Sequence, residues 1–119
     1  MKIAQIEQEG TLKLVRIQGN ACLPCDFRGD MIDVMQIPRF PETTGASLPL
    51  DQVRFLPAVT RPSKIVAIGL NYMDHVRESK GRVPESPLVF AKFPNALAAH
   101  RDPISWDPEV TQKVDFEAE

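Results

Sequence analysis

The sequence lacks any long apolar run and any strong excess of charge of one sign. No apolar stretch approaches the ~20 residues that a membrane-spanning helix requires. The formal net charge is −2, which gives no electrostatic reason to expect binding to nucleic acid or to an anionic membrane. The first seven residues show no signal-peptide core. We therefore expect a cytoplasmic protein with neither nucleic acid nor membrane as a partner.

Cysteine is also scarce, because the chain has only Cys22 and Cys25, which form a CxxC motif. Such a motif suits a redox pair or half of a zinc site. A structural zinc site needs four ligands, and the two histidines, His75 and His100, are the usual partners that remain. No βαβ pattern surrounds the pair, so two reduced thiols in a loop are the alternative interpretation.

Proline, in contrast, is abundant, with 11 residues in 119 against a usual frequency of about 5%. Because proline breaks helix interiors, this composition disfavours a helical bundle and favours short strands joined by extended turns. Hydrophobic content of 43% and charged content of 25% are ordinary for a globular protein. The length suffices for one domain, or for a small domain and part of another.

Residues 1–60 predict a small β-rich accessory domain without a cluster of reactive side chains. The expected elements are a hairpin over residues 1–20 that turns at Glu9-Gly10, an irregular stretch over 20–30, a third strand over 30–34, a loop over 38–49, and strand spacing at Val53 and Phe55. The domain boundary is expected near residue 60.

The central stretch, residues 64–78, predicts a strand, a tight turn and a short helix. The apolar run 65–68 is typical of a strand covered on both faces, Gly69 permits the tight turn, and Asn71 suits the helix N-cap. His75 and Glu78 then lie on one helical face. A carboxylate beside an imidazole orients it and favours its protonated form. That arrangement suits a general base that takes a proton from water. A solvated surface pair is the alternative.

The next stretch predicts a mobile polar loop over residues 79–86 and a buried strand over 88–91. Lys92 ends that strand. Its ammonium can reach into a cleft, or the side chain can extend along the surface into solvent.

The last six residues, 114–119, alternate between apolar and acidic side chains, as a strand with one polar face does. Asp115, Glu117 and Glu119 share the polar face. Two carboxylates from one strand suit a hard cation such as Mg²⁺, which prefers oxygen ligands. A solvent-facing polar edge is the alternative interpretation.

Three separated motifs, taken in order, resemble the fumarylacetoacetate hydrolase family. They are Lys-Ile-Val-Ala-Ile-Gly-Leu-Asn-Tyr-Met-Asp-His-Val-Arg-Glu at 64–78, Pro-Leu-Val-Phe-Ala-Lys at 87–92, and Val-Asp-Phe-Glu-Ala-Glu at 114–119. The resemblance covers roughly residues 53–119 and implies a β-rich α+β fold: a small N-terminal domain (1–60) followed by the first part of the family's mixed β-sandwich roll (61–119), usually as a homodimer.

The resemblance also implies roles for individual residues. His75 and Glu78 correspond to the water-activating pair, Lys92 and Tyr72 to substrate contacts, and Glu117 and Glu119 to ligands of Mg²⁺, with Mn²⁺ or Ca²⁺ as alternatives. The implied reaction is hydrolysis of a C–C bond in a β-diketo or 2-oxo acid, or decarboxylation or isomerisation of such an acid. The residue before Asn-Tyr is leucine, where acylpyruvate-hydrolysing relatives often have arginine, which leaves the substrate subclass open.

The family continues beyond the Glu-x-Glu motif with further strands and a third metal-binding aspartate. We therefore expect the chain to be the N-terminal portion of such an enzyme, truncated and inactive by itself. A non-enzymatic interaction module that pairs with another chain through an open sheet edge is the alternative.

Overall fold

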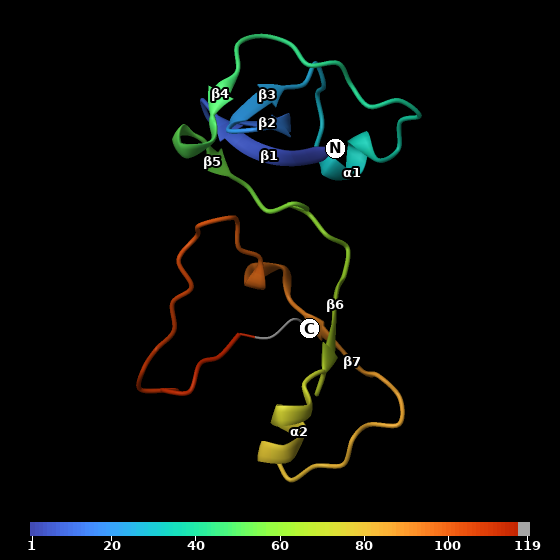
Figure 1. Ribbon diagram of the computed structural model, residues 1–119, viewed down its shortest axis with the longest axis vertical. Coiled ribbons are helices and arrows are strands. Elements are labelled where there is room, and N and C mark those ends of the chain that lie inside the picture. The colour runs from blue at the N-terminus through green and yellow to red at the C-terminus, as the bar shows by residue number, and fades with distance from the viewer. Residues whose placement is uncertain (117–119) are drawn as a thin grey trace. The chain divides into compact units, whose positions relative to one another are not determined.

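The computed structural model describes residues 1–116 of the 119. The chain divides into two compact units (Figure 1). Unit 1 comprises Met1–Arg61 and Leu97–Pro103, and unit 2 comprises Pro62–Ala96 and Ile104–Glu119. Strands outnumber helices in the described residues, so this part of the chain is β-rich. The assignment of two domains, 1–60 and 61–119, stays a prediction.

Unit 1 is built on a five-stranded antiparallel sheet with the order β4-β3-β2-β1-β5. Its strands are β1 Lys2–Gln8, β2 Thr11–Gln18, β3 Ala21–Pro24, β4 Leu48–Pro49 and β5 Arg54–Phe55, with a short 3-10 helix, η1, at Leu50–Gln52. The predicted hairpin is confirmed. Its turn residues Glu9 and Gly10 have φ values of 52° and 74°, as the tight turns that match the twist of paired strands require.

Two predictions for residues 20–34 are wrong. The stretch expected to be irregular contains β3, which pairs with β2 from Gln18↔Ala21 to Val15↔Pro24. The stretch expected to be a third strand is the helix α1 Met31–Val34. Asp30 accepts hydrogen bonds from the Ile32 and Asp33 amides, and Asp33 accepts one from the Asp30 amide. This capping box favours a helical turn over the extended conformation that the apolar residues suggested.

The core of unit 1 lies on both faces of the sheet, because consecutive strand residues point to opposite faces. Leu14 packs in a cluster with Cys25, Met31 and Val34, on the face that α1 covers. Its neighbour Val15 packs with Ile6 and Cys22 on the other face. Unit 1 thus buries apolar side chains in two small clusters.

The cysteines belong to this core, and the alternative interpretation of two reduced thiols in a loop is wrong in its location. Cys22 lies on β3 and is fully buried, and Cys25 directly follows β3 and is 6% exposed. Both thiols are free. Burial raises the pKa of each thiol, which lowers the fraction of reactive thiolate. The arrangement favours a packing role over a redox role.

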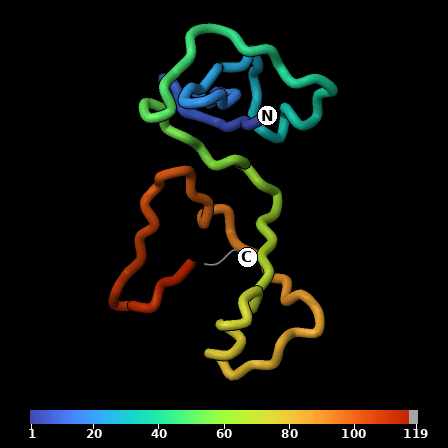
Figure 2. The backbone as a smooth tube through the Cα atoms, viewed as in Figure 1, coloured from blue at the N-terminus to red at the C-terminus, as the bar shows by residue number. Residues whose placement is uncertain are grey.

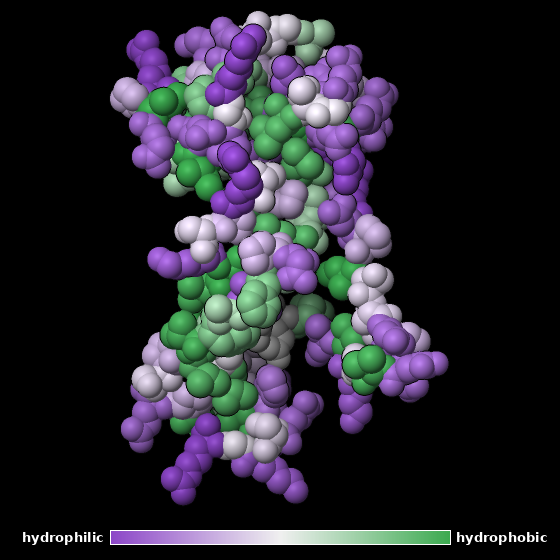
Figure 3. Space-filling model, turned by 180° about the vertical axis from the view of Figure 1, so that it is seen from behind, coloured by the Kyte–Doolittle hydropathy of each residue, from purple (hydrophilic) through white to green (hydrophobic). Residues whose placement is uncertain are grey.

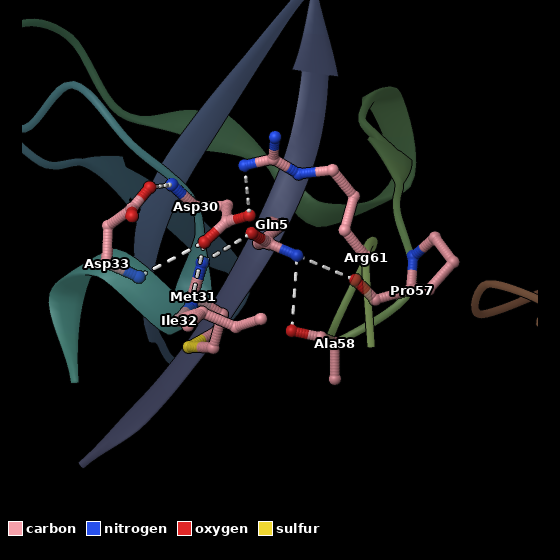
Figure 4. A network of polar contacts seen from close by, with 8 residues as sticks. All are labelled: Gln5, Asp30, Met31, Ile32, Asp33, Pro57, Ala58 and Arg61. Atoms are coloured by element: carbon pink, nitrogen blue, oxygen red, sulfur yellow. Dashed lines mark hydrogen bonds and ion pairs between the residues drawn. The ribbon is translucent and has the colours of Figure 1, made fainter. Parts of the chain in front are cut away.

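A buried polar network joins β1 to α1 and to the segment that leaves the sheet (Figure 4). The fully buried Gln5 donates from Nε2 to the Pro57 and Ala58 carbonyls at 2.7 and 3.1 Å. Its Oε1 accepts from the Met31 amide at 2.7 Å. Asp30, which caps α1, also accepts from Arg61 at 2.9 Å. These bonds tie three separate segments together within unit 1.

Unit 2 contains a two-stranded antiparallel sheet and one helix. Strand β6 Ile65–Gly69 pairs with β7 Leu88–Lys92 from Ile65↔Lys92 to Gly69↔Leu88, and α2 Met73–Glu78 follows β6. A 3-10 turn, η2 Pro94–Ala96, follows β7. Figure 2 traces the backbone from β6 through α2 and the irregular stretch 79–87 into β7. The predicted order of strand, helix, loop and strand is confirmed.

The predicted burial of these strands is wrong for the residues that the structure describes. Val66 on β6 is 59% exposed, and all five residues of β7 are exposed. Hydrophobic residues gather over β6 and β7 on the face shown in Figure 3. A continuous apolar run indicates that a strand can be buried on both faces. A two-stranded sheet, however, does not by itself supply elements that cover both of its faces.

The strand predicted at the end of the chain is not found in its described part. Residues 114–116 have no strand assignment, because alternation alone supplies no partner for the backbone hydrogen bonds of a strand. The remaining residues, 117–119, lie outside the described range. Within residues 1–116, no helix has the length and the apolar character to cross a membrane.

Candidate active site

The helix α2 begins through a backbone turn that differs from the predicted one. The left-handed conformation falls on Leu70, with φ at 52°, and not on Gly69. A Cβ on Gly69 would lie 3.3 Å from Leu88 Cδ2, so this glycine serves the close approach of β7. The prediction that Asn71 is the N-cap is wrong, because the N-cap is Tyr72. A strained turn at a branched residue is typical of functional sites.

The helix α2 carries four charged or titratable side chains next to this turn. His75 and Glu78 are exposed and three positions apart, as the motif predicts. Asp74 is paired with Arg77 at 2.9 Å on the same helix. Both members of that ion pair are largely exposed, so the pair contributes little to stability. Val76 anchors the helix, because it is only 3% exposed.

Asp74, His75 and Glu78 of α2 line an open cleft within unit 2, with a volume of about 610 Å³. Four of the six predicted site residues contribute to it: Tyr72, His75, Glu78 and Lys92. The cleft therefore brings together α2 and the end of β7, two segments that are separated in the sequence by the loop 79–87. Its volume is within the range of small-molecule sites.

The far end of the chain supplies another wall of the cleft, formed by Lys113, Asp115 and Phe116. The predicted metal ligands Glu117 and Glu119 lie outside the described residues. Sequence reasoning did not select Lys113, for which no motif gives a signal, or Asp74. Asp115 was placed on the acidic face of the predicted strand but not assigned to the site, although its alternation with Glu117 was the available signal.

One of the two positively charged side chains that line the cleft, Lys92, makes an aromatic contact. The Lys92 ammonium lies 5.7 Å from the centre of the Phe90 ring, within the range of a cation–π interaction. Phe90 and Lys92 alternate on β7 and so share one face of the strand. Together with Lys113, Lys92 provides two ammonium groups that can bind the carboxylates of an acid.

The described residues do not by themselves form a metal centre. Among residues 1–116, no group of three or more His, Cys, Asp or Glu side chains is placed to hold a metal ion. Asp115 is the one described member of the acidic pattern at 115–119. The residues that the structure describes therefore provide an imidazole, carboxylates, a phenol and two amines around one cleft, a set suited to proton transfer on a bound anion.

Comparison with known proteins shows which family these residues resemble. Residues 64–119 match the family model described as "Fumarylacetoacetate (FAA) hydrolase C-terminal". The chain is 44% identical over 72 residues to the oxaloacetate tautomerase Fahd2a, mitochondrial, of Rattus norvegicus, and 47% identical over 72 residues to FAHD2A of Bos taurus. Each match covers 60% of this chain and 23% of the relative, so the chain spans about a quarter of these relatives.

Two uncharacterized proteins extend the comparison. One from Archaeoglobus fulgidus is 48% identical over 75 residues, covering 63% of this chain and 29% of that protein. A solved structure from Mycobacterium abscessus is 32% identical with a TM-score of 0.52, covering 79% of this chain and 34% of that one. The motifs at 64–78, 87–92 and 114–119 all fall within the family match. Residues 64–119 are therefore similar to the C-terminal domain of the fumarylacetoacetate hydrolase family.

Proposed function

We propose that this chain provides the histidine-bearing part of the active site of a Mg²⁺-dependent enzyme that tautomerises a 2-oxo acid. The observation that carries the proposal is the cleft in which Tyr72, His75, Glu78 and Lys92 meet. The mammalian relatives are named oxaloacetate tautomerases, which favours isomerisation over hydrolysis or decarboxylation. The fold expected for the complete site is the family's mixed β-sandwich roll.

The side chains of the cleft suit each requirement of a tautomerase. Keto–enol exchange moves one proton between the carbon beside a carbonyl and the carbonyl oxygen, without adding water. His75 would remove and return that proton, and Glu78 would orient its imidazole. Lys92 and Lys113 would bind the carboxylates of the acid. The Tyr72 hydroxyl would donate a hydrogen bond to the oxygen on which negative charge develops.

Glu117 and Glu119 are the residues that we propose as ligands for Mg²⁺. Bound Mg²⁺ supplies a Lewis acid that stabilises negative charge on the substrate oxygens. This part of the proposal rests on the family match over 64–119 and on the acidic alternation at 115–119. Calorimetric titration with Mg²⁺ tests it, with Glu117→Gln as the variant and Glu109→Gln, an exposed glutamate outside the cleft lining, as the control.

The reaction is tested by following the enol and keto forms of oxaloacetate by NMR in D₂O. A tautomerase exchanges deuterium into the carbon beside the carbonyl and leaves the carbon chain intact. The assay uses the complete enzyme that contains this part, because the chain by itself is expected to be inactive. There, His75→Gln should lower the rate by about 10²–10⁴-fold. His100→Gln replaces the only other histidine, which belongs to unit 1, and should retain the rate. Loss of CO₂, or an unchanged rate in His75→Gln, would contradict the proposal.

A second candidate function is an interaction module that pairs with another polypeptide, including a second copy of this chain. It is favoured by the exposed apolar side chains of unit 2, among them Val89, Phe93 and Phe116 at 61%, 79% and 90% exposure. Sedimentation velocity separates this candidate from the first. A stable complex without Mg²⁺ binding or proton exchange would support the module, and proton exchange by a monomer would contradict it.

A further inference from the structure

A second pocket, with a volume of about 570 Å³, lies within unit 1 and shares no lining residue with the cleft of unit 2. Its walls come from segments far apart in the sequence. Lys2 begins β1, Ile17 lies on β2, Leu50 begins η1, Phe55 lies on β5, and His100 and Arg101 belong to the segment Leu97–Pro103 that returns to unit 1. We call it the unit 1 pocket.

The inner wall of the unit 1 pocket is apolar. Ile17, Leu50 and Phe55 are partly buried and pack against the cluster of Ile6, Val15 and Cys22 on this face of the sheet. The His100 ring meets the Phe55 ring edge to face, with centroids 5.4 Å apart and an angle of 83°. Such a pair has a preferred geometry, so it fixes the imidazole at the edge of the apolar wall.

The rim of the pocket carries an excess of positive charge, although the whole chain has a net charge of −2. Lys2 and Arg101 contribute two positive charges, and Asp51 contributes one negative charge. The His100 imidazole carries an N–H donor in either protonation state. An anion at this rim would meet a guanidinium, an ammonium and an imidazole.

The backbone presents Arg101 at this rim in an unusual conformation. Arg101 has a φ of 70°, in the left-handed region that glycine or asparagine usually occupies. The surrounding turn is closed by a hydrogen bond from the Asp102 amide to the Ala99 carbonyl at 3.2 Å and by one from the Ala99 amide to Asp102 Oδ2 at 2.8 Å. A long cationic side chain at a position suited to glycine is a local cost that a function can explain.

We propose that the unit 1 pocket binds a small organic anion: a carboxylate with a flat or branched apolar body. The carboxylate is bound by Arg101 and Lys2, and the body lies against Phe55, Ile17 and Leu50. The volume fits a molecule of this class. The site is separate from the cleft and does not depend on the reaction proposed there.

Benzoate is the probe for this site, because it combines one carboxylate with one flat apolar ring. In NMR titrations of the whole chain, benzoate should shift the amide signals of Gly19 and Asn20, which line the pocket, with a Kd on the order of 1 mM. Benzamide has the same shape without the charge, and acetate has the charge without the ring. Each should bind about tenfold more weakly or worse, and added salt should weaken benzoate binding.

Arg101→Gly is the decisive variant, because glycine suits a φ of 70° and removes only the side chain. It should weaken benzoate binding about tenfold without lowering the urea midpoint of the protein. Arg28→Ala removes an exposed arginine of unit 1 outside the pocket lining and is the matched control. Binding that survives in Arg101→Gly, benzamide that binds as tightly as benzoate, or shifts confined to the cleft residues 72–78 would each overturn the proposal.

Discussion

Replacing Gln5 by leucine should destabilise unit 1, although leucine is the more hydrophobic residue. Gln5 is fully buried and makes three hydrogen bonds, to the Met31 amide and to the Pro57 and Ala58 carbonyls. Leucine fills a similar volume but leaves those backbone groups without this partner. A buried polar group that loses its partner costs about 1–3 kcal/mol.

The net effect follows from comparing the loss with the gain. We take a loss of about 3 kcal/mol for the Met31 amide and the two part-buried carbonyls together. Burying the leucine side chain offsets about 1 kcal/mol of this. A net cost of about 2 kcal/mol is a sizeable fraction of the 5–15 kcal/mol that typically stabilises a protein of this kind. With a urea m-value of ~1.5 kcal/mol/M, the unfolding midpoint should fall by about 1 M.

Far-UV circular dichroism is the suitable assay. The only tryptophan and the only tyrosine, Trp106 and Tyr72, both belong to unit 2, so their fluorescence reports on that unit and not on the network. Gln18→Leu is the matched control, because Gln18 is exposed at the end of β2, and its midpoint should stay within about 0.3 M of the parent. Equal midpoints for Gln5→Leu and the parent would refute the reasoning.

A second substitution at the same position tests the direction of the hydrogen bonds. In Gln5→Glu, a carboxylate replaces the amide that donates to two carbonyl oxygens. Burial and those oxygens should raise the pKa of the introduced carboxyl. Stability that depends on its neutral form is lost as the pH rises through that raised pKa. Relative to the parent at each pH, this variant should be weaker at pH 7 than at pH 4.

Three further outcomes are expected. Hydrogen bonds from the Arg61 side chain and nearby amides lower the pKa of the Asp30 carboxyl. The stabilising effect of this carboxylate is therefore present above pH ~4 and is lost as the pH falls through the lowered pKa. The difference in melting temperature between the parent and Asp30→Asn should accordingly disappear in acid. Gly29→Ala, whose Cβ would lie 2.8 Å from Asp33 Oδ2, should cost on the order of 2 kcal/mol in urea unfolding, more than Gly45→Ala, which meets nothing within 4 Å. Because burial raises the pKa of both cysteines, a thiol reagent at pH 8 should modify them slowly in the native chain and rapidly in urea.

Local patterns in the sequence predicted the elements that depend on neighbouring residues. The Glu9-Gly10 turn marked the first hairpin, and the apolar run at 65–68 marked β6. The signal for α1 was equally local, since Asp30 and Asp33 have capping-box spacing, but the strand prediction rested on the apolar residues between them. The Gly-Asn pair at 19–20 is a local signal for the turn between β2 and β3 that the prediction of an irregular stretch did not use.

Long-range features were not available from these patterns. Gln5 gives no sign in the sequence that its side chain meets Met31 and Pro57, because a lone glutamine in a strand is usually at the surface. The cleft is a partial exception: four of its predicted residues meet there because a strand, a short helix and a returning strand keep Tyr72, His75 and Lys92 close. Lys113 also lines the cleft but belongs to a segment without regular structure, so the spacing of residues in the sequence does not predict its position.

The charges around the cleft give a physical reason to expect a cation when a dianionic acid binds. Among the described lining residues, Glu78 and Asp115 carry negative charges and Lys92 and Lys113 carry positive ones, while Asp74 is paired with Arg77. Two ammonium groups therefore balance two carboxylates before any substrate enters, and Glu117 and Glu119 add two more negative charges to the sequence next to Asp115. A dianion would meet net repulsion, which a divalent cation removes. Oxalate, a dianion that resembles the enolate of a 2-oxo acid, should therefore bind at least tenfold more tightly with Mg²⁺ present, and a calorimetric affinity indifferent to Mg²⁺ would show that the two lysines suffice.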